Sequence, residues 1–484
     1  MSIETSQKSF TSRLSESRQD QFMQKAVAKA QDTQWEKREG SRQKLGNWAQ
    51  WRELGEQIRK ETLNHLDYYL NQFSEQVTKR GGHVYFATTA EEARNVIKEI
   101  VQTKKAKKIA KAKSMVTEEI GMNEMLRDMG IDLLESDLAE FILQTDDWDA
   151  PSHIVFPDIH KNRGQIQELF QRKLNYKGDD SPQNMARFVR GILREHFLHS
   201  DIGITGCNFA IANLGAINLV TNEGNADLIQ SLPKTQIVVM GMERIVPTLE
   251  DAEILDNLLC RSAVGQDLTS YITYAGPKNE DENDGPEDYH VIIVDNGRSK
   301  ILGTEFQPIL QCIRCGACLN VCPVYRHIGG HSYGSIYPGP VGAILSPLLG
   351  GYEKYHDLPF ASSLCAACTD TCPVKIPLHE LLIAHRRRIT EDEKMTNIFQ
   401  HLQFQMIALG SASPFLFKSA LKMAHSSSWL LTSKGQSCVG NFSSDGFINR
   451  GPGIVSGWTR VRDMTRPPGA SSNFRNWYRQ HQKK

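Results

Sequence analysis

Short apolar runs alternate with helical stretches between residues 80 and 300 of the chain. Val84, Tyr85 and Phe86 predict a short buried strand, and Thr89 with Glu92 predicts a capping box that starts the next helix. Strands interleaved with helices in this way indicate an α/β domain. Four more strand-like runs follow in this region, at residues 202–205, 216–220, 237–240 and 291–294.

The N-terminal part of the chain has a different pattern. Residues 1–40 are polar and rich in Gln, Lys and Ser, so we expect them to be frayed or loosely helical. Between residues 42 and 74, apolar side chains recur at helical spacing and predict a helix with one apolar face that packs on the domain after it.

Helical signals return from residue 390. Thr390 and Glu393 predict a second capping box, and apolar residues follow it on one helix face. The tail holds Trp458, Phe474 and Trp477 among basic residues, and we expect it to pack on a neighbouring surface.

Residues 301–385 are dense in Cys, Pro and Gly and have weak periodicity. Such a segment builds a core of its own with difficulty, so an inorganic centre is a plausible organiser. We therefore expect four parts: an N-terminal helical segment (1–75), an α/β domain (76–300), a cysteine-rich domain (301–385) and a helical C-terminal region (386–484).

Composition narrows the class of protein. The chain has 484 residues, and its 56 Lys and Arg balance 56 Asp and Glu. This balance argues against a general nucleic-acid binder, which needs surplus positive charge to meet phosphates. No apolar run reaches the about 18–20 residues that span a bilayer, and the N-terminus lacks the apolar core of a secretory signal. We expect a cytoplasmic protein, with peripheral attachment to the inner membrane face as an alternative.

Seven of the ten cysteines lie between Cys312 and Cys372. The first run, Cys312-Ile-Arg-Cys315-Gly-Ala-Cys318-Leu-Asn-Val-Cys322-Pro, has the C-x2-C-x2-C-x3-C-P spacing of bacterial ferredoxins. Structural zinc is the competing interpretation, but zinc usually takes two separated pairs of ligands. The remaining cysteines, Cys207, Cys260 and Cys438, are expected to be small buried apolar residues.

The second run keeps the last three cysteines of the same pattern. Ser362 stands where the first cysteine would be, before Cys365, Cys368 and Cys372-Pro373. In two-cluster ferredoxins the fourth cysteine of each run ligates the other cluster. That crossing predicts two ligand sets: Cys312, Cys315, Cys318 and Cys372 for cluster one, and Cys322, Cys365 and Cys368 for cluster two.

Cluster two is therefore one thiolate short. Three thiolates fit a [3Fe–4S] centre, or a [4Fe–4S] centre whose fourth iron is held by water, substrate or a side chain, whereas cluster one is expected to be [4Fe–4S]. The hydroxyl of Ser362 is a candidate fourth ligand, although a poor one beside thiolate. Fewer anionic ligands should raise the potential of cluster two, so two centres of unequal potential would form a short electron path.

Two glycine-rich turns follow strand-like runs, at Gly203–Gly206 and Thr221–Asn225. Neither fits a dinucleotide fingerprint. They are either tight turns that need positive φ or part of a substrate pocket at strand ends. In such a pocket Glu223 is a candidate base or nucleophile.

Two basic features carry weaker signals. The lysines between Lys104 and Lys113 are predicted to form a solvated helix face, with an anionic ligand as the alternative. His327 and His331 follow the first cysteine run and either pack in a loop or tune a cluster by hydrogen bonds to sulfur.

The chain resembles the lactate utilization protein B family along nearly its full length. Residues 203–226, GITGCNFAIANLGAINLVTNEGNA, look like the signature of the LUD domain, which is similar in fold to the sugar-isomerase and CoA-transferase group. The stretch CPVYRHIGGHSYGSIYPGP between the cysteine runs, the missing first cysteine of the second run and the tail GWTRVRDMTRPPGASSNFRNWYRQ also match that family.

The resemblance implies an iron–sulfur subunit that carries electrons in a system oxidising L-lactate to pyruvate, with a quinone or another acceptor. It also implies two partners: a CCG-type cysteine-rich subunit and a smaller LUD-only subunit. From the family we carry over only the seven cysteine ligands.

Two rival functions remain. In one, the chain is itself the 2-hydroxy-acid oxidising enzyme, with substrate at Glu223 in the LUD domain or at the open iron of cluster two. However, hydride removal from lactate normally needs a flavin or nicotinamide acceptor, and no fingerprint for either is visible. In the other, the clusters are structural parts of a scaffold.

Overall fold

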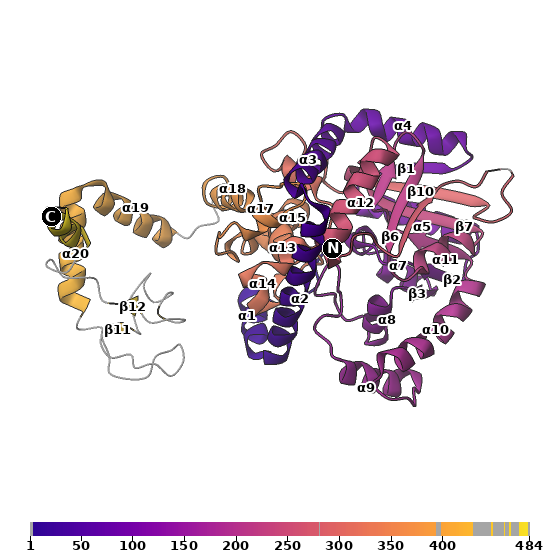
Figure 1. Ribbon diagram of the computed structural model, residues 1–484, viewed down its shortest axis with the longest axis horizontal. Coiled ribbons are helices and arrows are strands. Elements are labelled where there is room, and N and C mark those ends of the chain that lie inside the picture. The colour runs from indigo at the N-terminus through magenta and orange to yellow at the C-terminus, as the bar shows by residue number, and fades with distance from the viewer. Residues whose placement is uncertain are drawn as a thin grey trace. The chain divides into compact units, whose positions relative to one another are not determined.

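The computed structural model describes residues 3–279, 281–393, 398–428, 447–448, 459, 464–465 and 474–482. The chain divides into two compact units, Met1–Glu393 and Lys394–Lys484 (Figure 1). Among the described residues, no helix is both long and apolar enough to cross a membrane.

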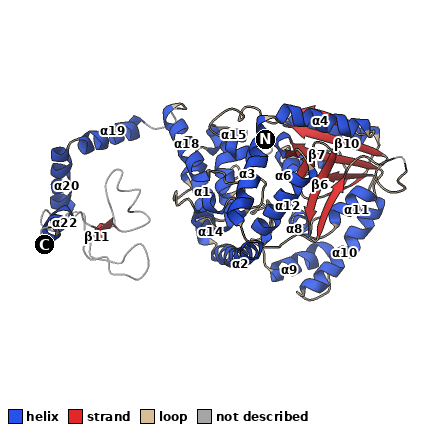
Figure 2. Ribbon diagram, turned by 45° about the horizontal axis from the view of Figure 1, so that its top comes forward, coloured by secondary structure: helices blue, strands red, loops and turns tan. Residues whose placement is uncertain are grey.

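A parallel six-stranded sheet is the centre of the α/β region. The strands lie in the order β1 (His83–Ala87), β10 (Asp288–Val294), β7 (Thr235–Gly241), β4 (Ile202–Thr205), β2 (Lys108–Lys111) and β3 (Asp132–Glu135). A second sheet of four strands has the order β8 (Ile245–Val246), β5 (Phe209–Ile211), β6 (Ala216–Thr221) and β9 (Tyr271–Ala275). Figure 2 shows both sheets at one side of the first unit. The predicted α/β architecture is confirmed.

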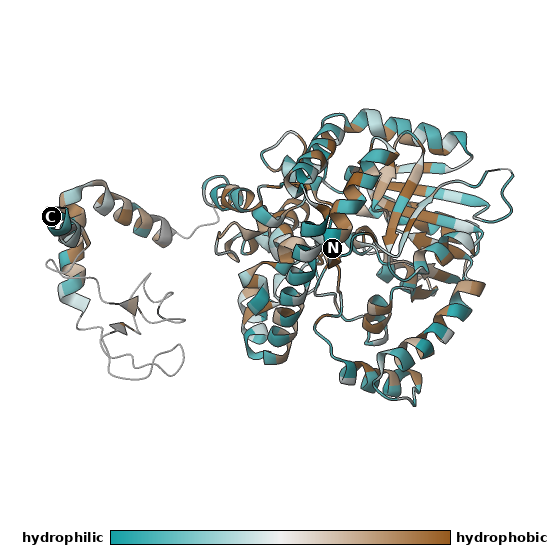
Figure 3. Ribbon diagram, viewed as in Figure 1, coloured by the Kyte–Doolittle hydropathy of each residue, from teal (hydrophilic) through white to brown (hydrophobic). Residues whose placement is uncertain are grey.

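The main sheet is buried on both faces. Ile237 and Val239 of β7 pack in one apolar cluster with helices α5 to α7, whereas Val238 and Met240 pack in another with α4, α10 and α11. Successive side chains of a strand point to opposite faces, so a strand covered on both sides has a continuous apolar run. Figure 3 shows these strands as mainly hydrophobic ribbon. The helices of this region are α5 (Ala90–Thr103), α6 (Met115–Glu119), α7 (Met122–Asp128), α8 (Leu138–Thr145), α9 (Arg163–Leu174), α10 (Pro182–His199), α11 (Asn225–Ser231) and α12 (Leu249–Val264).

Half of the predicted capping box is present: Thr89 caps α5, but Glu92 bonds the residue before the cap. Its hydroxyl oxygen accepts a hydrogen bond from the backbone N–H of Glu92 at 3.2 Å. The Glu92 carboxylate accepts from the backbone N–H of Thr88 at 2.7 Å, one residue before the cap. The two bonds satisfy N–H groups that a helix start otherwise leaves unpaired.

Helices cover most of the described N-terminal segment, so of the two expectations for residues 1–40 the helical one holds and the frayed one is wrong. Gln31 donates hydrogen bonds from its amide to the carbonyls of Leu319 and Cys322, at 2.8 and 3.2 Å. Arg38 donates to the carbonyl of Thr371 at 2.8 Å. These polar residues are buried because they pair with backbone of the cysteine-rich region. The helices are α1 (Phe10–Gln19), α2 (Gln21–Leu45), α3 (Trp48–Asn64) and α4 (Leu66–Lys79).

The helix predicted over residues 42–74 is divided at two places. Gly46 and Asn47 have φ values of 64° and 42° between α2 and α3, and His65 separates α3 from α4. These breaks let α3 and α4 lie against different parts of the molecule. Ile58 of α3 packs with the cysteine-rich region, and Phe73 of α4 packs against the sheet.

The cysteine-rich region consists of short helices around loops. Its buried residues belong to one apolar cluster with α2, α3 and α12, so this region shares a core with its neighbours. The elements are η2 (Gln307–Gln311), α13 (Ala317–Asn320), α14 (Pro323–Ile328), η3 (His331–Tyr333), α15 (Gly339–Gly350), α16 (Tyr352–Tyr355), η4 (Leu358–Phe360), α17 (Ala367–Thr371) and α18 (Leu378–Glu391).

The capping box predicted at Thr390 and Glu393 is wrong. Thr390 lies in the last turn of α18, and its hydroxyl donates to the carbonyls of Arg386 and Arg387. A Ser or Thr hydroxyl can bond backward to a helix carbonyl as readily as it caps a helix start, and the sequence pattern alone does not separate the two.

The described helices of the second unit, α19, α20 and α22, carry exposed apolar side chains. Leu402, Met406 and Leu409 are 54%, 69% and 65% exposed. Phe474 and Trp477 are exposed and stack on each other, with ring centroids 5.6 Å apart, while Trp458 and Cys438 lie outside the described residues. The elements are α19 (Ile398–Ala412), α20 (Pro414–Ser428), β11 (Phe447–Ile448), β12 (Met464–Thr465) and α22 (Phe474–His481).

Gly203 gives a test of this packing. Its φ is not positive, contrary to one expectation for this turn, and it lies inside β4. A Cβ at this position would lie 2.2 Å from the carbonyl oxygen of Ile229. We predict that Gly203→Ala lowers the free energy of unfolding by about 2 kcal/mol, because backbone must move to admit the methyl group.

The matched control is Gly40→Ala in α2, where a Cβ meets nothing within 4 Å. We expect this substitution to stabilise the protein by up to about 1 kcal/mol, since alanine favours a helix over glycine. Urea unfolding of both variants measures the difference. Equal midpoints for Gly203→Ala and the parent chain would contradict the close contact at β4.

Candidate metal centre and adjoining hollow

Cys312, Cys315, Cys318 and Cys372 line one small cavity of about 20 Å³, which we call the four-cysteine cavity. The other lining residues are mainly apolar, and they include Val341 of α15. Three of the cysteines come from the first run and one comes from the second. The structure therefore brings together side chains that are up to 60 positions apart in the chain.

The other three cysteines form a second group beside the first. Burial raises the pKa of Cys322, and the nearby Cys365 adds to this shift. Burial raises the pKa of Cys368 to about 12, with contributions from Cys322 and Cys365. Cys365 is exposed, whereas Cys322 and Cys368 are buried. One side of this second group is therefore open to solvent.

Both cysteine loops use the same backbone conformation. Arg314 and Gly316 flank Cys315 with φ values of 60° and 73°, and Leu364 and Ala366 flank Cys365 with values of 54° and 63°. Each loop then enters a short helix, α13 or α17. The left-handed conformation is costly for residues other than glycine, so its recurrence at matching positions indicates that both loops are shaped for the same purpose.

Backbone N–H groups point at the sulfur atoms. The Arg314 N–H donates to Cys312 Sγ, the Tyr325 N–H to Cys322 Sγ and the Ile376 N–H to Cys372 Sγ, each at 3.4 Å. Hydrogen bonds of this kind stabilise negative charge on thiolate sulfur and tune the potential of a bound cluster.

Arginines surround the four-cysteine cavity. Arg52 donates to the carbonyl of Cys372 at 2.8 Å, and Arg244 donates to the carbonyl of Cys312 at 3.3 Å. Arg59, which is fully buried, donates to the carbonyl of Gln311 at 3.3 Å. Buried guanidinium groups need negative charge nearby.

The donor set fits an anionic iron–sulfur cluster. Burial raises the pKa of Cys315 to about 12, so this thiol would stay protonated at neutral pH without a metal. A bound metal replaces the thiol proton and stabilises the thiolate. Thiolates on iron would in turn supply the negative charge that the surrounding arginines require.

A buried charge network joins this region to the α/β region. Arg298 donates to both carboxylate oxygens of Glu119, at 2.7 and 2.8 Å, and to Glu243 at 2.7 Å. Burial alone would raise the pKa of Glu243, but Arg298 and other arginines outweigh it and hold that pKa at about 2. Tyr337 also donates to Glu119 at 2.7 Å, and Arg314 Nη2 lies 3.5 Å from Glu243.

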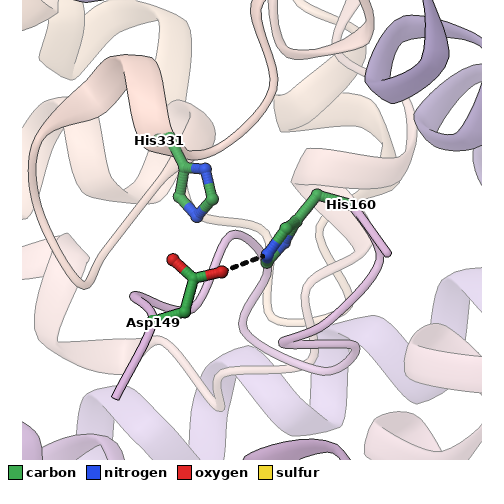
Figure 4. Close-up of side chains that lie close together, drawn as sticks. All are labelled: Asp149, His160 and His331. Carbon is green, nitrogen blue, oxygen red and sulfur yellow. Dashed lines mark hydrogen bonds and ion pairs between the residues drawn. The ribbon is translucent and has the colours of Figure 1, made fainter. Parts of the chain in front are cut away.

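The described contacts of His331 go to backbone and rings. Its Nε2 lies 2.7 Å from the carbonyl oxygen of Ala150, and its ring meets the edge of His160, which bonds Asp149 at 3.0 Å (Figure 4). The three side chains lie close enough to hold a metal ion. However, the Lys161 ammonium lies 2.7 Å from the Asp149 carboxylate. This ion pair already balances the charge of the carboxylate without a metal ion. His327 is exposed.

A second cavity, which we call the strand-end hollow, lies where strands of the main sheet end. It has a volume of about 440 Å³. Residues that follow the carboxyl ends of β2, β3 and β4 line it, which is the usual place for ligands in an open parallel sheet. Its charged lining residues are Lys113, Asp137, Asp158, Glu223, Arg244 and Arg314.

Glu223 lies in this hollow, as one interpretation of the sequence expects. Burial raises its pKa to about 7, and Asp137 adds to the shift. Its carboxylate accepts a hydrogen bond from the backbone N–H of Leu138 at 3.3 Å. Gly224, beside it, has the positive φ (72°) that the turn requires, whereas Gly206 does not.

The lysine run does not form a helix face, so that prediction is wrong. Lys108–Lys111 is strand β2, and Lys111 is fully buried between Glu135 at 2.6 Å and Glu118 at 2.9 Å. Lys113 lines the strand-end hollow. Parallel pairing with β3 and β4 overrides the surface pattern that the charges suggest.

The strand-end hollow and the four-cysteine cavity share two lining residues, Ile154 and Arg314. The sequence analysis missed Arg314, although it lies inside the first cysteine run, and it missed Arg244, for which the sequence carries no signal. Two of the scattered cysteines, Cys207 and Cys260, also line the hollow, and burial raises the pKa of both thiols. Cys260 is buried, as expected, whereas Cys207 is only half-buried.

Two family models match parts of this chain. Residues 70–294 match the family described as LUD domain, and residues 308–376 match the 4Fe-4S dicluster domain. A crystal structure of a DUF162 family protein from Deinococcus radiodurans is 15% identical and covers 47% of this chain and 98% of its own, with a TM-score of 0.27.

Curated relatives match along the whole chain. Lactate utilization protein B of Bacillus pumilus is 56% identical over 483 residues, which is 100% of this chain and 99% of the relative. The protein of the same name from Bacillus cereus is 55% identical over the same lengths. The family resemblance seen in the motifs is thus confirmed, and the chain belongs to the lactate utilization protein B family.

Proposed function

We propose that this chain is an iron–sulfur electron-transfer subunit in the oxidation of L-lactate to pyruvate. The observation that carries the proposal is the sorting of seven cysteines into a group of four and a group of three, side by side in one region. Relatives named for lactate utilization supply the metabolic context.

Each group of cysteines would hold one cluster. Cys312, Cys315, Cys318 and Cys372 hold a [4Fe–4S] cluster in this proposal. Cys322, Cys365 and Cys368 hold a second centre, either [4Fe–4S] or [3Fe–4S]. Clusters transfer single electrons, so their role is to pass charge onward from a two-electron oxidation.

Ser362 stays a candidate for the fourth ligand of the second centre. Its hydroxyl oxygen accepts a hydrogen bond from the backbone N–H of Leu364 at 3.1 Å. A water molecule is the alternative, and the exposure of Cys365 supports it because solvent reaches this side of the group.

The proposal includes the organisation of the chain and its partners. The proposed chain has four parts: a helical segment (1–75), a LUD domain (76–300), the cluster domain (301–385) and a helical C-terminal region (386–484). The partners are a CCG-type cysteine-rich subunit and a LUD-only subunit, and the system works in the cytoplasm or at the inner membrane face. The exposed apolar side chains of α19 and α20 suit contact with such partners.

A second function is favoured by one observation. The strand-end hollow shares Arg314 with the four-cysteine cavity, so a substrate in the hollow would lie beside the first cluster. In this alternative the chain itself oxidises the 2-hydroxy acid, with Glu223 as the base. The two-electron step would still need a flavin or nicotinamide acceptor from elsewhere.

The crossed assignment of ligands predicts which variants lose the same cluster. Cys372→Ala should remove the electron paramagnetic resonance (EPR) signal that Cys312→Ala removes, and Cys322→Ala should remove the signal that Cys368→Ala removes. Loss of one thiolate from a cubane weakens its binding, so iron content falls with the signal. Cys260→Ala is the matched control, because Cys260 is also buried but lies outside both groups. Shared behaviour of Cys372→Ala and Cys368→Ala would contradict the crossing.

The electron-transfer role predicts that L-lactate reduces the clusters in the assembled system. The chain is purified anaerobically with its neighbouring gene products, and the visible and EPR spectra are followed after lactate is added. We expect reduction in the assembly and none in the isolated chain. Turnover of lactate by the isolated chain with an artificial acceptor would favour the enzyme alternative, and clusters that lactate cannot reduce in the assembly would count against electron transfer.

A further inference from the structure

The charges of the strand-end hollow lie in two groups. Burial, Asp137 and Asp158 raise the pKa of Glu223, and Lys113 acts in the opposite direction. The three carboxyl groups are therefore neighbours, and among the described residues Lys113 is the one cation beside them in the lining of the hollow. Arg244 and Arg314 also act on each other, and both act on Cys312. The hollow therefore has an acidic part and a basic part, and the basic part is next to the four-cysteine cavity.

Arg314 holds an unused donor in the basic part. Its side chain is nine-tenths buried, and its guanidinium lies 5.0 Å over the ring of Tyr337. Nη2 faces Glu243, but Nη1 has no hydrogen-bond partner among the residues that the structure describes. Nη1 is closed to solvent, so a ligand in the hollow would act on Arg314 through the charge of the guanidinium group.

We propose that the strand-end hollow binds a small monocarboxylate of the hydroxy-acid or oxo-acid class, whose carboxylate lies in the basic part beside Arg244 and Arg314. The choice of acid rests on the proposed function. The carboxyl groups at Asp137, Asp158 and Glu223 disfavour a ligand with more negative charge, such as phosphate. Because the volume of about 440 Å³ exceeds that of a three-carbon acid, water would fill the space between the ligand and the acidic part.

Binding in the hollow should be coupled to the first cluster. Arg314 lines both cavities, so its positive charge stabilises extra negative charge on the cluster. A carboxylate beside Arg314 offsets that charge and makes the cluster harder to reduce. By linkage, reduction of the cluster weakens the binding of the carboxylate by the same factor.

The test uses the full-length protein with its clusters, purified anaerobically, and pyruvate as a probe that does not itself donate electrons to the clusters. Redox titration followed by EPR measures the midpoint potential of each cluster with and without pyruvate. We expect the midpoint of the cluster at Cys312 to fall and that of the other cluster to move less. Pyruvate should also raise the melting temperature of the protein.

Variants locate the site. Arg314→Gln should weaken pyruvate binding about tenfold or more, because it removes a positive charge from the basic part. Since Arg314 lies inside a cluster loop, Arg244→Gln serves as a second variant, and iron content shows whether each variant keeps its clusters. Arg52→Gln is the matched control: it removes an arginine beside the same cluster, on the Cys372 carbonyl, but Arg52 does not line the hollow. It should shift the potential and keep the response to pyruvate.

Several results would overturn the proposal: an unchanged midpoint and melting temperature with pyruvate, an equal response in Arg314→Gln, Arg244→Gln and parent chains, or a response to inorganic phosphate alone. Different results would overturn the proposed electron-transfer function and the proposed binding site. If lactate reduces the clusters of the assembled system while pyruvate does not bind this chain, the electron-transfer role stands and the binding site falls. If the protein holds no iron, the melting temperature still tests the hollow.

Discussion

Buried carboxylates of Glu119 and Glu243 link the α/β region, through Arg298, to the cysteine-rich region, through Tyr337 and Arg314. Glu119 ends α6, Glu243 follows β7, and Tyr337 and Arg314 reach the same carboxylates from the cysteine-rich side. Charges removed from water are stable only with complete partners, so this network admits few arrangements of the elements that carry it. The position of Arg314 between the two cavities is one result of that constraint.

The N-terminal helices supply a second constraint. Gln31, Arg38 and Arg52 bond backbone carbonyls next to the cysteines, so α2 and α3 hold the ends of the cluster loops. Irregular loops leave many carbonyl groups without a helical or strand partner, and buried carbonyls need donors. The polar residues of this segment are therefore part of the interior of the first unit.

The sequence was most informative where chemistry imposes a spacing. The alternation of strands and helices predicted the α/β architecture. The cysteine spacing predicted two ligand sets, and the four cysteines of the first set line one cavity, although their binding of a cluster stays a prediction. Contacts between residues that are far apart in the sequence leave no comparable spacing pattern. The burial of Lys111 depends on Glu118 and Glu135, and the burial of Gln31 depends on carbonyls almost 300 positions away. A local pattern of charge carries no record of these partners, so neither burial was predicted.

The seven cysteines of the two runs differ in their exposure to solvent, so one side of the cysteine-rich region is more accessible than the other. Cys315 and Cys372 are buried, Cys312 and Cys318 are half-buried, and Cys365 is exposed. A redox protein, a chelator or dioxygen therefore has its most direct access at Cys365. The exposed side at Cys365 is thus both the shortest route for electrons to an outside partner and the place where oxidative damage would begin.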